Sequence, residues 1–244
     1  MILLKVGTRG SRLSLIQTEL VADSIRRQNS GLRIDRTVIS TAGDVDKRTP
    51  LFSLDQKGIF EKEIDEAVLD GRVDFAVHSM KDIPVFNKGS GLLIASVPER
   101  GPVADVLVSK GDVPLRVLKR ASRIGTSSLL RVAQLRRVRP DLNPEPIRGN
   151  VETRIRKVDN GEFDAVVLAE AGLERLGMTG RISEQLLVED FMPAPGQGAL
   201  AVVARSDNLG VIDILRSIEH PQTRGEIEAE RELVRILEGG CKVP

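Results

Sequence analysis

Asp74-Phe75-Ala76-Val77 is a short apolar run, and His78-Ser79-Met80-Lys81-Asp82 follows it directly. We interpret the first part as a buried strand and the second part as the polar segment at its carboxyl end. In open α/β sheets, ligands bind at the carboxyl ends of the strands. Lys81 beside Asp82 can therefore anchor an anion next to an acid or a cation-stabilising carboxylate, and a plain ion pair in a loop is the competing interpretation. His78 is interpreted as a hydrogen-bonded structural histidine.

Short β-branched runs alternate with helical patterns along the rest of the chain, which is typical of an α/β fold with largely parallel or mixed sheets. The apolar run 199–204 is expected to return to the first part of the chain, which gives two lobes joined by two crossover segments. The other expected strands are 2–6, 33–40, 106–108, 123–125 and 163–168, and helices are expected from about residues 11, 60, 128, 151 and 222.

Length and composition exclude several classes of protein. A chain of 244 residues has room for one large or two modest domains. Its apolar runs are shorter than the roughly 20 residues that span a bilayer, and Lys5 interrupts the N-terminal run before a signal-peptide core can form. We therefore expect a cytoplasmic protein without a membrane partner. With one cysteine and two histidines, we expect no disulfide framework and no metal site.

The net charge of +1 hides an asymmetry between two parts of the chain. Residues 116–157 hold 12 basic and 3 acidic side chains, whereas residues 158–238 hold 7 basic and 16 acidic ones. Such a basic stretch can neutralise phosphates and bind nucleic acid. However, the chain has no Trp or Tyr and only six Phe, so it lacks the stacking platforms of single-strand binders. We favour a basic cleft for small anions and expect no nucleic-acid partner.

Two segments carry residues suited to anions. Gly125-Thr126-Ser127-Ser128 closes an expected strand and opens a helix, so that backbone N–H groups and hydroxyls can bind an anion, and plain helix capping is the alternative. The segment around Arg148 and Arg154 puts two guanidinium groups beside a glycine turn, and a guanidinium suits bidentate carboxylate binding. These segments are candidates for binding the same kind of ligand.

Three more sites suit ligand contacts or a reactive thiol. Arg9 and Ser11 follow the first expected strand, and Lys57 ends the long polar loop 41–57. Cys241 stands after Gly239-Gly240, on an expected turn behind the last helix. For a lone cysteine the ordinary interpretation is an incidental residue.

Taken together, these segments resemble the porphobilinogen deaminase family, also called hydroxymethylbilane synthase, of tetrapyrrole and haem biosynthesis. The resemblance runs from Val6 to Pro244 and comprises nine blocks in the family's order. The blocks are Val6-Gly7-Thr8-Arg9, Lys57-Gly58-Ile59-Phe60, the run from Ala76 to Pro84, Gly125-Thr126-Ser127-Ser128-Leu129, Arg148-Gly149-Asn150-Val151, Asp159-Asn160-Gly161, Ala171 to Gly177, Pro195-Gly196-Gln197-Gly198-Ala199 and Leu237-Glu238-Gly239-Gly240-Cys241.

The resemblance implies a transferase that joins four porphobilinogen units head to tail and loses ammonia with each unit. It implies a dipyrromethane cofactor attached to Cys241 through a thioether. Each pyrrole carries an acetate and a propionate, which explains a need for several Arg and Lys partners. Asp82 matches the family residue that stabilises the cation left by ammonia, which makes it the catalytic residue.

The remaining site residues are carried over from the family one by one. Cofactor contacts are matched to Lys81, Thr126, Ser127, Ser128, Arg131, Arg148, Arg154 and Gln197, and substrate contacts to Arg9, Ser11, Lys57, Arg148, Arg154 and Arg175. The implied fold is periplasmic-binding-protein-like (type II), with two lobes of mixed five-stranded sheets and flanking helices. The expected domains are 1–98 with 198–217, then 103–193, and 218–244 as the remnant of a truncated third domain. We expect a monomer.

The chain departs from the family pattern at three places. Leu130 stands where the family usually has an arginine before Arg131, and the segment 101–105 lacks the family's arginine. The family normally continues for several dozen residues beyond its cofactor cysteine, whereas this sequence ends at Pro244. An inactive homologue that binds small anions or pyrrole carboxylates is therefore the alternative function, and nucleic-acid binding through residues 116–157 is a third.

Overall fold

The computed structural model describes residues 2–41, 61–85 and 91–237. Contacts divide the chain into two units. The described part of unit 1 is 2–41, 61–85, 91–101 and 198–237, and the described part of unit 2 is 102–197. The expected domain boundaries, including a third-domain remnant at 218–244, stay predictions; the described residues 218–237 are grouped with unit 1.

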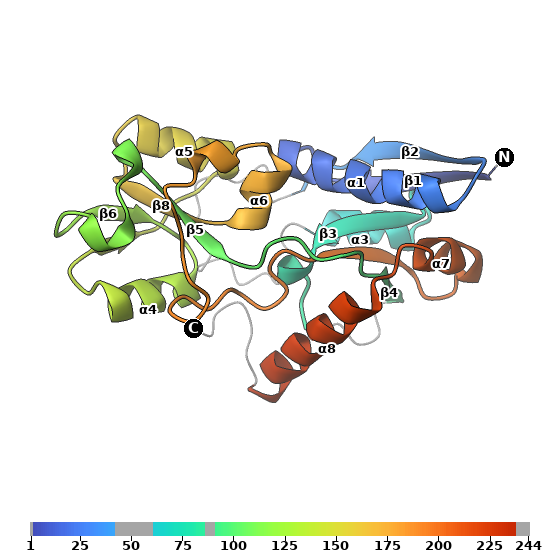
Figure 1. Cartoon of the computed structure of the whole chain (residues 1–244). Coiled ribbons are helices and arrows are strands. Elements are labelled where there is room, and N and C mark those ends of the chain that lie inside the picture. Colours follow the sequence, from blue (N-terminus) through green and yellow to red (C-terminus); the bar gives the residue numbers. More distant parts are fainter. Residues whose placement is uncertain (1, 42–60, 86–90, 238–244) are drawn as a thin grey trace. The chain divides into compact units, whose positions relative to one another are not determined.

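Unit 1 is built on a five-stranded mixed sheet in the order β2-β1-β3-β10-β4 (Figure 1). Strands β2 and β3 both run parallel to β1, and β10 runs antiparallel to β3 and β4. Its strands and helices are β1 (Ile2–Thr8), α1 (Arg12–Gln28), β2 (Leu32–Val38), α3 (Lys62–Leu69), β3 (Phe75–Ser79), the 3₁₀ turn η2 (Met80–Asp82), β4 (Leu92–Ser96), β10 (Leu200–Arg205), α7 (Leu209–Arg216) and α8 (Pro221–Ile236).

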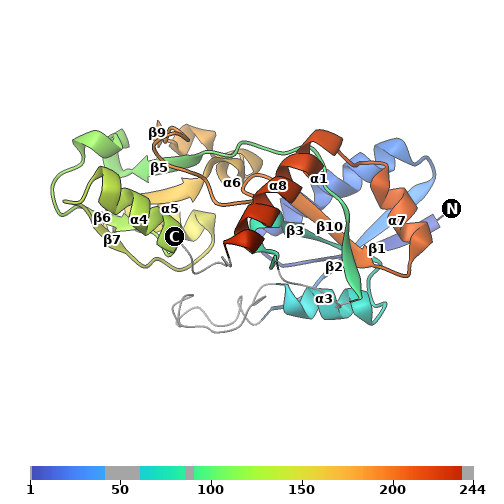
Figure 2. The ribbon, with the colours of Figure 1, turned by 90° about the horizontal axis from the view of Figure 1, so that it is seen from below.

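Successive side chains of a strand point to opposite faces of the sheet. Because apolar side chains lie on both faces here, helices cover both faces. In β10, Leu200 and Val202 belong to the core that α1 and α7 close, whereas Ala201 and Val203 belong to the core that includes Ile227 of α8. Helix α3 covers the same face as α8, beneath Ala76. Figure 2 shows α1 and α3 on opposite sides of the strands of unit 1.

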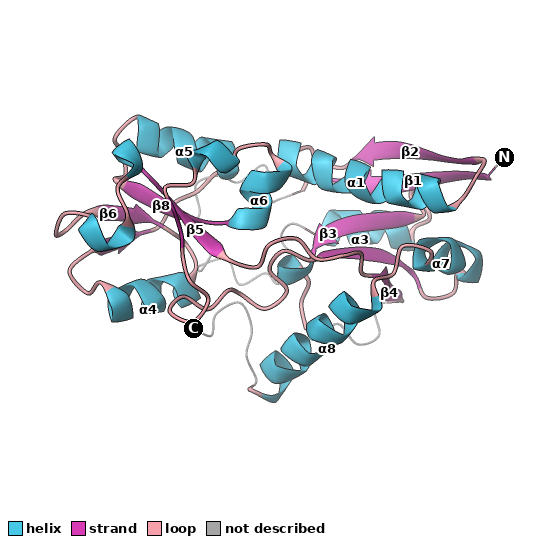
Figure 3. Ribbon diagram, viewed as in Figure 1, coloured by secondary structure: helices cyan, strands magenta, loops and turns pink. Residues whose placement is uncertain are grey.

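Unit 2 repeats this plan with its own sheet, in the order β7-β6-β8-β5-β9. Strands β7 and β8 run parallel to β6, and β5 runs antiparallel to β8 and β9. Helix α4 packs on one face, and α5 and α6 pack on the other (Figure 3). The strands and helices are β5 (Asp105–Ser109), β6 (Arg123–Gly125), α4 (Leu129–Val138), β7 (Asn143–Glu145), α5 (Val151–Asp159), β8 (Ala165–Ala169), α6 (Glu170–Arg175) and β9 (Glu184–Gln185), with 3₁₀ turns at Lys110–Asp112, Leu115–Val117 and Thr179–Arg181.

The two mixed five-stranded sheets with flanking helices confirm the predicted fold class, but several local predictions were wrong. The proline-rich segment 140–146, which the sequence predicts as a turn, contains the strand β7, because an edge strand tolerates the missing N–H of Pro144. The sequence pattern of the last helix predicts buried positions at Ile227, Leu233, Val234 and Leu237. Ile227 is buried, whereas Leu233 in α8 and Leu237 just after it are 58% and 64% exposed. No helix in the described ranges is long and apolar enough to cross a membrane.

Candidate functional site

In unit 1, the sheet brings two functional segments to one edge. Strand β1 ends at Thr8 and the neighbouring parallel strand β3 ends at Ser79, so the residues after both strands lie at the same end of the sheet. Arg9 follows β1, and Asp82 closes the turn η2 after β3. The predicted segment from His78 to Asp82 therefore occupies the position at which α/β sheets bind ligands.

A polar pocket lies at this edge within unit 1. It has a volume of about 30 Å³, which is room for water-sized groups. Arg9 and Asp82 both line it, so the structure brings these two predicted site residues together. The residues that line the pocket are Arg9, Ser14, Gln17, Glu61, Val77, His78, Ser79 and Asp82.

Backbone and side-chain hydrogen bonds fix the turn that carries Asp82. Met80 is buried, its N–H donates to the carbonyl of Ala199 over 3.0 Å, and its own carbonyl accepts from the N–H of Ile83 over 3.1 Å. Gln17 Nε2 donates to Ser79 Oγ at 3.2 Å and so ties α1 to the end of β3. Asp82 itself is exposed, so its carboxylate projects from a fixed backbone turn and is open to solvent.

Helix α8 also holds this turn, and sequence reasoning missed that contact. Arg231 donates from Nη1 to the carbonyl of Ile83 at 3.1 Å and from Nη2 to the carbonyl of Pro84 at 2.9 Å. Burial lowers the pKa of Arg231 below its ordinary value. Arg231 is one of many charged residues in α8. The sequence does not show which of them makes a tertiary contact, because the partner carbonyls lie almost 150 residues away in the chain.

Ser11 has a structural role at the start of α1. Its hydroxyl accepts from the N–H of Ser14 at 3.3 Å and lies 2.8 Å from Ser14 Oγ, so Ser11 is the N-cap of the helix. Thr18 Oγ1 donates to Thr8 Oγ1 at 2.8 Å, and both side chains are buried. Hydrogen bonds of this kind join the end of β1 to the first turns of α1 and fix the backbone around Arg9. Lys81 is half-buried in the turn η2.

Acidic groups surround the pocket of unit 1, and one of them is buried. Glu61 is only 5% exposed, and burial followed by repulsion from Asp82 and Asp65 raises its pKa to about 8. His78 Nε2 lies 3.3 Å from Asp65 Oδ1, and neither atom has a hydrogen-bond partner in the part of the chain that the structure describes. His78 is buried, and its role as a hydrogen-bonded structural histidine stays a prediction. No three His, Cys, Asp or Glu residues of the described ranges are placed to hold a metal ion.

In unit 2, the predicted hydroxyl segment follows β6 and is held by its own hydrogen bonds. Ser127 Oγ donates to the carbonyl of Ile147 at 2.8 Å and accepts from its N–H at 3.1 Å. Ser128 caps α4 by accepting from the N–H of Arg131, and its own N–H donates to Thr126 Oγ1 at 3.2 Å. These contacts correspond to the helix-capping alternative, and they place the segment beside the turn that leads to Arg148.

That second turn holds two of the predicted arginines close to each other in the chain. Gly149 has a φ of +111°, and a Cβ there would lie 2.6 Å from Thr153, so only glycine fits. Asn150 caps α5 by accepting from the N–H of Thr153 at 2.9 Å. Arg154 donates from Nε to the carbonyl of Gly149 at 2.8 Å, and both Arg148 and Arg154 are half-buried.

Arg131 and Gln197 belong to a buried network around Asp105. Arg131 donates from Nε and Nη2 to the two oxygens of Asp105, at 2.9 and 2.6 Å, and from Nη1 to the carbonyl of Val167 at 3.0 Å. Gln197 Nε2 donates to Asp105 Oδ1 at 2.7 Å and to the carbonyl of Val103 at 2.8 Å. Arg131 therefore already has a carboxylate partner inside the protein, and its predicted contact with a cofactor carboxylate stays a prediction.

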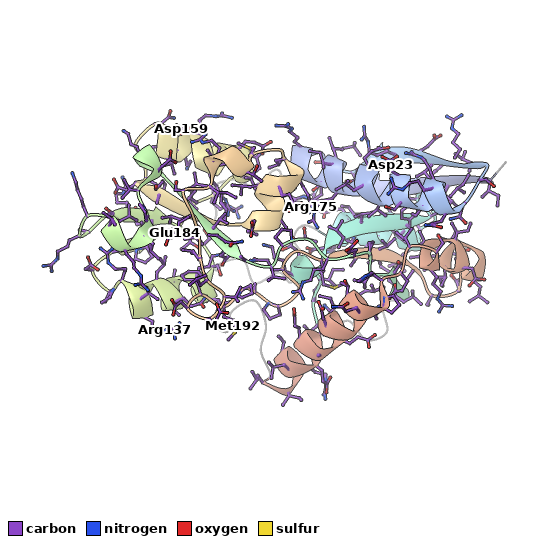
Figure 4. All side chains as sticks on the ribbon, in the orientation of Figure 1. Asp23, Arg137, Asp159, Arg175, Glu184 and Met192 are labelled. Atoms are coloured by element: carbon purple, nitrogen blue, oxygen red, sulfur yellow. The ribbon has the colours of Figure 1, made fainter. Side chains whose placement is uncertain are left out.

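The last predicted arginine of unit 2 stands at the end of α6. Arg175 is labelled on this helix in Figure 4. Burial lowers its pKa below the ordinary value, against the opposing charge of Glu174. Strand β8 is parallel to β6 and β7, so the segments that follow these three strands begin at the same end of the sheet. Helix α6, which carries Arg175, is the segment that follows β8. Lys57 and Cys241 lie outside the described residues.

Solved structures of other proteins share this architecture. The methionine binding protein MetQ has a TM-score of 0.56 at 12% identity, covering 98% of this chain and 96% of that chain. The periplasmic VFT2 domain of Bordetella pertussis BvgS has a TM-score of 0.51 at 16% identity, covering 95% and 92%. These likenesses show the fold alone, and they confirm the predicted periplasmic-binding-protein-like class.

Sequence comparison identifies the family. The family model "Porphobilinogen deaminase, dipyromethane cofactor binding domain" matches residues 4–213. A probable porphobilinogen deaminase of Nitrosopumilus maritimus is 49% identical over 98% of this chain and 76% of its own length. The porphobilinogen deaminase of Desulforudis audaxviator is 47% identical over 98% of this chain and 77% of its own length. The chain belongs to the porphobilinogen deaminase family.

Proposed function

We propose that this chain joins four porphobilinogen units head to tail, releases ammonia with each unit, and so forms the linear tetrapyrrole hydroxymethylbilane. Family membership supports the substrate class. The observation that carries the proposal is the pocket of unit 1, where Asp82 and Arg9 meet at the carboxyl ends of β1 and β3. A cytoplasmic location and a monomeric state stay predictions.

Asp82 is proposed to stabilise positive charge on the substrate. When ammonia leaves the aminomethyl group, the carbon left behind is part of a cation that is delocalised over the pyrrole ring. A carboxylate that is already fixed in place stabilises such a cation without reorganising during the reaction. The hydrogen bonds of Met80 and Arg231 support this role, because they fix the turn on both sides of Asp82.

Arginines are proposed to bind the acetate and propionate groups. Guanidinium groups bind carboxylates with paired hydrogen bonds, and half-buried ones do so more strongly than exposed ones. Arg9 of unit 1 and Arg148, Arg154 and Arg175 of unit 2 are the candidates. Lys57, Lys81 and Ser11 are further candidates from the family resemblance.

The donor set of unit 2 fits a dipyrromethane group, which carries four carboxylates. Arg148, Arg154 and the turn Thr126–Ser128 would hold it, and Cys241 would carry it through a thioether. When bound, the group supplies the pyrrole carbon to which the first substrate unit is joined. Gln197 and Arg131 would support this region from the Asp105 network.

Turnover of porphobilinogen by the purified chain tests the proposal. We expect release of ammonia and of a linear tetrapyrrole, and we expect Asp82→Asn to lower kcat by at least about 10²-fold with an unchanged circular dichroism spectrum. Asp70→Asn, at an exposed position after α3, is the matched control and should keep the full rate. Equal rates for both variants would refute the role of Asp82. A chain that binds porphobilinogen without turnover would instead support the alternative function, a binding protein for pyrrole carboxylates.

A further inference from the structure

Glu61 is a buried carboxyl group whose position is fixed by the start of α3. Its carbonyl accepts from the N–H groups of Ile64, at 3.0 Å, and Asp65, at 2.8 Å. The helix itself is anchored by Ile64, Ala67 and Val68, which are buried under the sheet. Glu61 stands at the N-cap position, yet its side chain makes no capping hydrogen bond. The carboxyl group is therefore not used to close the helix.

The side chain of Glu61 instead lines the same pocket as Asp82, and it is only 5% exposed. The charged and titratable groups around it come from every neighbouring element: Arg9 after β1, Asp65 on α3, His78 on β3 and Asp82 on η2. Three carboxyl groups thus share a small region with one arginine and one histidine. Close carboxylates cannot all ionise at low cost, so one of them keeps its proton.

Burial and these neighbours identify the group that keeps the proton. Burial is the largest cause that raises the pKa of Glu61 to about 8, and the charges of Asp82 and Asp65 act in the same direction. A hydrogen bond with the backbone of Glu61 itself and the charge of Arg9 lower the pKa, but they do not outweigh burial. At neutral pH the pocket therefore holds Glu61 as a neutral acid, and a cation that enters the pocket favours its ionised form.

We propose that Glu61 is a further catalytic residue of this pocket, which gives up its proton when the substrate's ammonium group enters and takes up the proton that is released as each carbon–carbon bond forms. This inference rests on the proposed function of the chain. A carboxyl group suits such an exchange because general bases work best when their pKa lies near the operating pH.

The proton balance of one addition closes with these groups. The substrate enters as an ammonium ion, and Glu61 releases its proton to solvent. The carbon–nitrogen bond then breaks, its electron pair leaves on ammonia, and the remaining cation lies beside two carboxylates. The acceptor pyrrole carbon forms the new carbon–carbon bond, loses its hydrogen as a proton to Glu61, and regains its ring electrons. Each addition therefore yields one linked unit, one molecule of ammonia and one proton, which is the proton that Glu61 releases to solvent when the substrate enters.

Glu61→Gln tests the proposal, since the amide keeps the shape of the neutral acid but cannot exchange a proton. We expect kcat to fall by about 10²-fold. In the unsubstituted chain, kcat/KM should rise with pH up to about 8, where Glu61 ionises in the free protein. This rise should be absent in Glu61→Gln and unchanged in Glu66→Gln, whose carboxyl group is exposed on the same helix. An unchanged rate and pH profile in Glu61→Gln would overturn the proposal.

A second measurement does not depend on turnover. Carbon-13 NMR of glutamate-labelled protein, with the Glu61 signal identified by its loss in Glu61→Gln, should show a carboxyl group that titrates near pH 8. Methylammonium, added at pH 7 as a cation probe, should shift this signal toward the ionised form. Titration in the ordinary range of glutamate would overturn the proposal. If the unsubstituted chain does not turn over porphobilinogen, the proposed function fails, and the NMR titration still decides whether Glu61 holds a proton.

Discussion

The two units share one sheet plan but place opposite charges around their buried carboxyl groups. In unit 2, Asp105 lies 2.6 Å from the guanidinium of Arg131, and both side chains are almost fully buried. In unit 1, the buried Glu61 faces the further carboxyl groups of Asp82 and Asp65. The comparison teaches that the two buried acids differ in their neighbours, since Asp105 has an arginine partner whereas Glu61 faces further carboxyl groups.

The same comparison holds for the helix starts next to the two central strands. Ser11 caps the helix that follows β1, and Ser128 caps the helix that follows β6. The residues just before these caps differ, since Arg9 stands there in unit 1, whereas Thr126 and Ser127, whose hydroxyls make internal hydrogen bonds, stand there in unit 2. The turns that follow the two central strands therefore carry different side chains.

The largest effect on stability is expected from breaking the buried ion pair of unit 2. Arg131→Met leaves Asp105 as a buried carboxylate without its arginine, which should lower the free energy of unfolding by about 3–5 kcal/mol. Urea denaturation measures the loss. Arg136→Met changes an exposed arginine of the same helix and should cost little. Equal losses of unfolding free energy in the two variants would show that the Asp105–Arg131 pair contributes no more to stability than an exposed arginine does.

The buried acid of unit 1 should show the opposite behaviour, because removing its charge stabilises the fold. Glu61 has a folded pKa of about 8 against a reference of 4.5, so the folded state binds the extra proton between these values and loses stability as pH rises through them. Glu61→Gln should match the unsubstituted chain near pH 5 and exceed its free energy of unfolding by about 2–4 kcal/mol near pH 9. Thermal unfolding across this pH range measures the difference, and a difference that is constant with pH would contradict the assignment.

A smaller effect is expected at the contact between α8 and the turn of Asp82. Arg231→Met removes two hydrogen bonds to the carbonyls of Ile83 and Pro84, which should cost about 1–3 kcal/mol of stability. Because the turn carries Asp82, kcat should fall more than KM rises. Arg235→Met, at an exposed ion pair of the same helix, is the control. If kcat is the same in both variants, α8 does not position Asp82.

Much of the fold could be predicted from the sequence because its strands are short apolar runs bounded by turn residues. The strands around 74–77, 106–108 and 163–168 were found in this way, and each lies in the middle of a sheet. The edge strands β4, β7 and β9 were missed; β7 and β9 have only three and two residues and no continuous apolar run, whereas β4 carries the apolar run 92–95 and was overlooked. The pattern of the first helix predicts Leu13, Ile16, Leu20 and Ile25 on its buried face, but Leu20 is 48% exposed. Gln17 is buried instead and donates a hydrogen bond to Ser79.

The candidate site was predicted where chemistry and chain position coincide, as at Arg9 and Asp82. Sequence reasoning missed Glu61 and Arg231, because their roles depend on burial and on partners far away in the chain. A glutamate at the start of a helix predicts only a favourable charge near the dipole. The three-dimensional structure is needed to show that its side chain is buried among other carboxyl groups.

The most direct test of the account is the intact mass of the purified chain after expression in a host that makes haem. The account predicts a mass above that of the sequence, 26.7 kDa, by two pyrrole units, and predicts that Cys241→Ala loses this addition. An unmodified Cys241 would contradict the proposed transferase and would favour a binding protein built on the same fold.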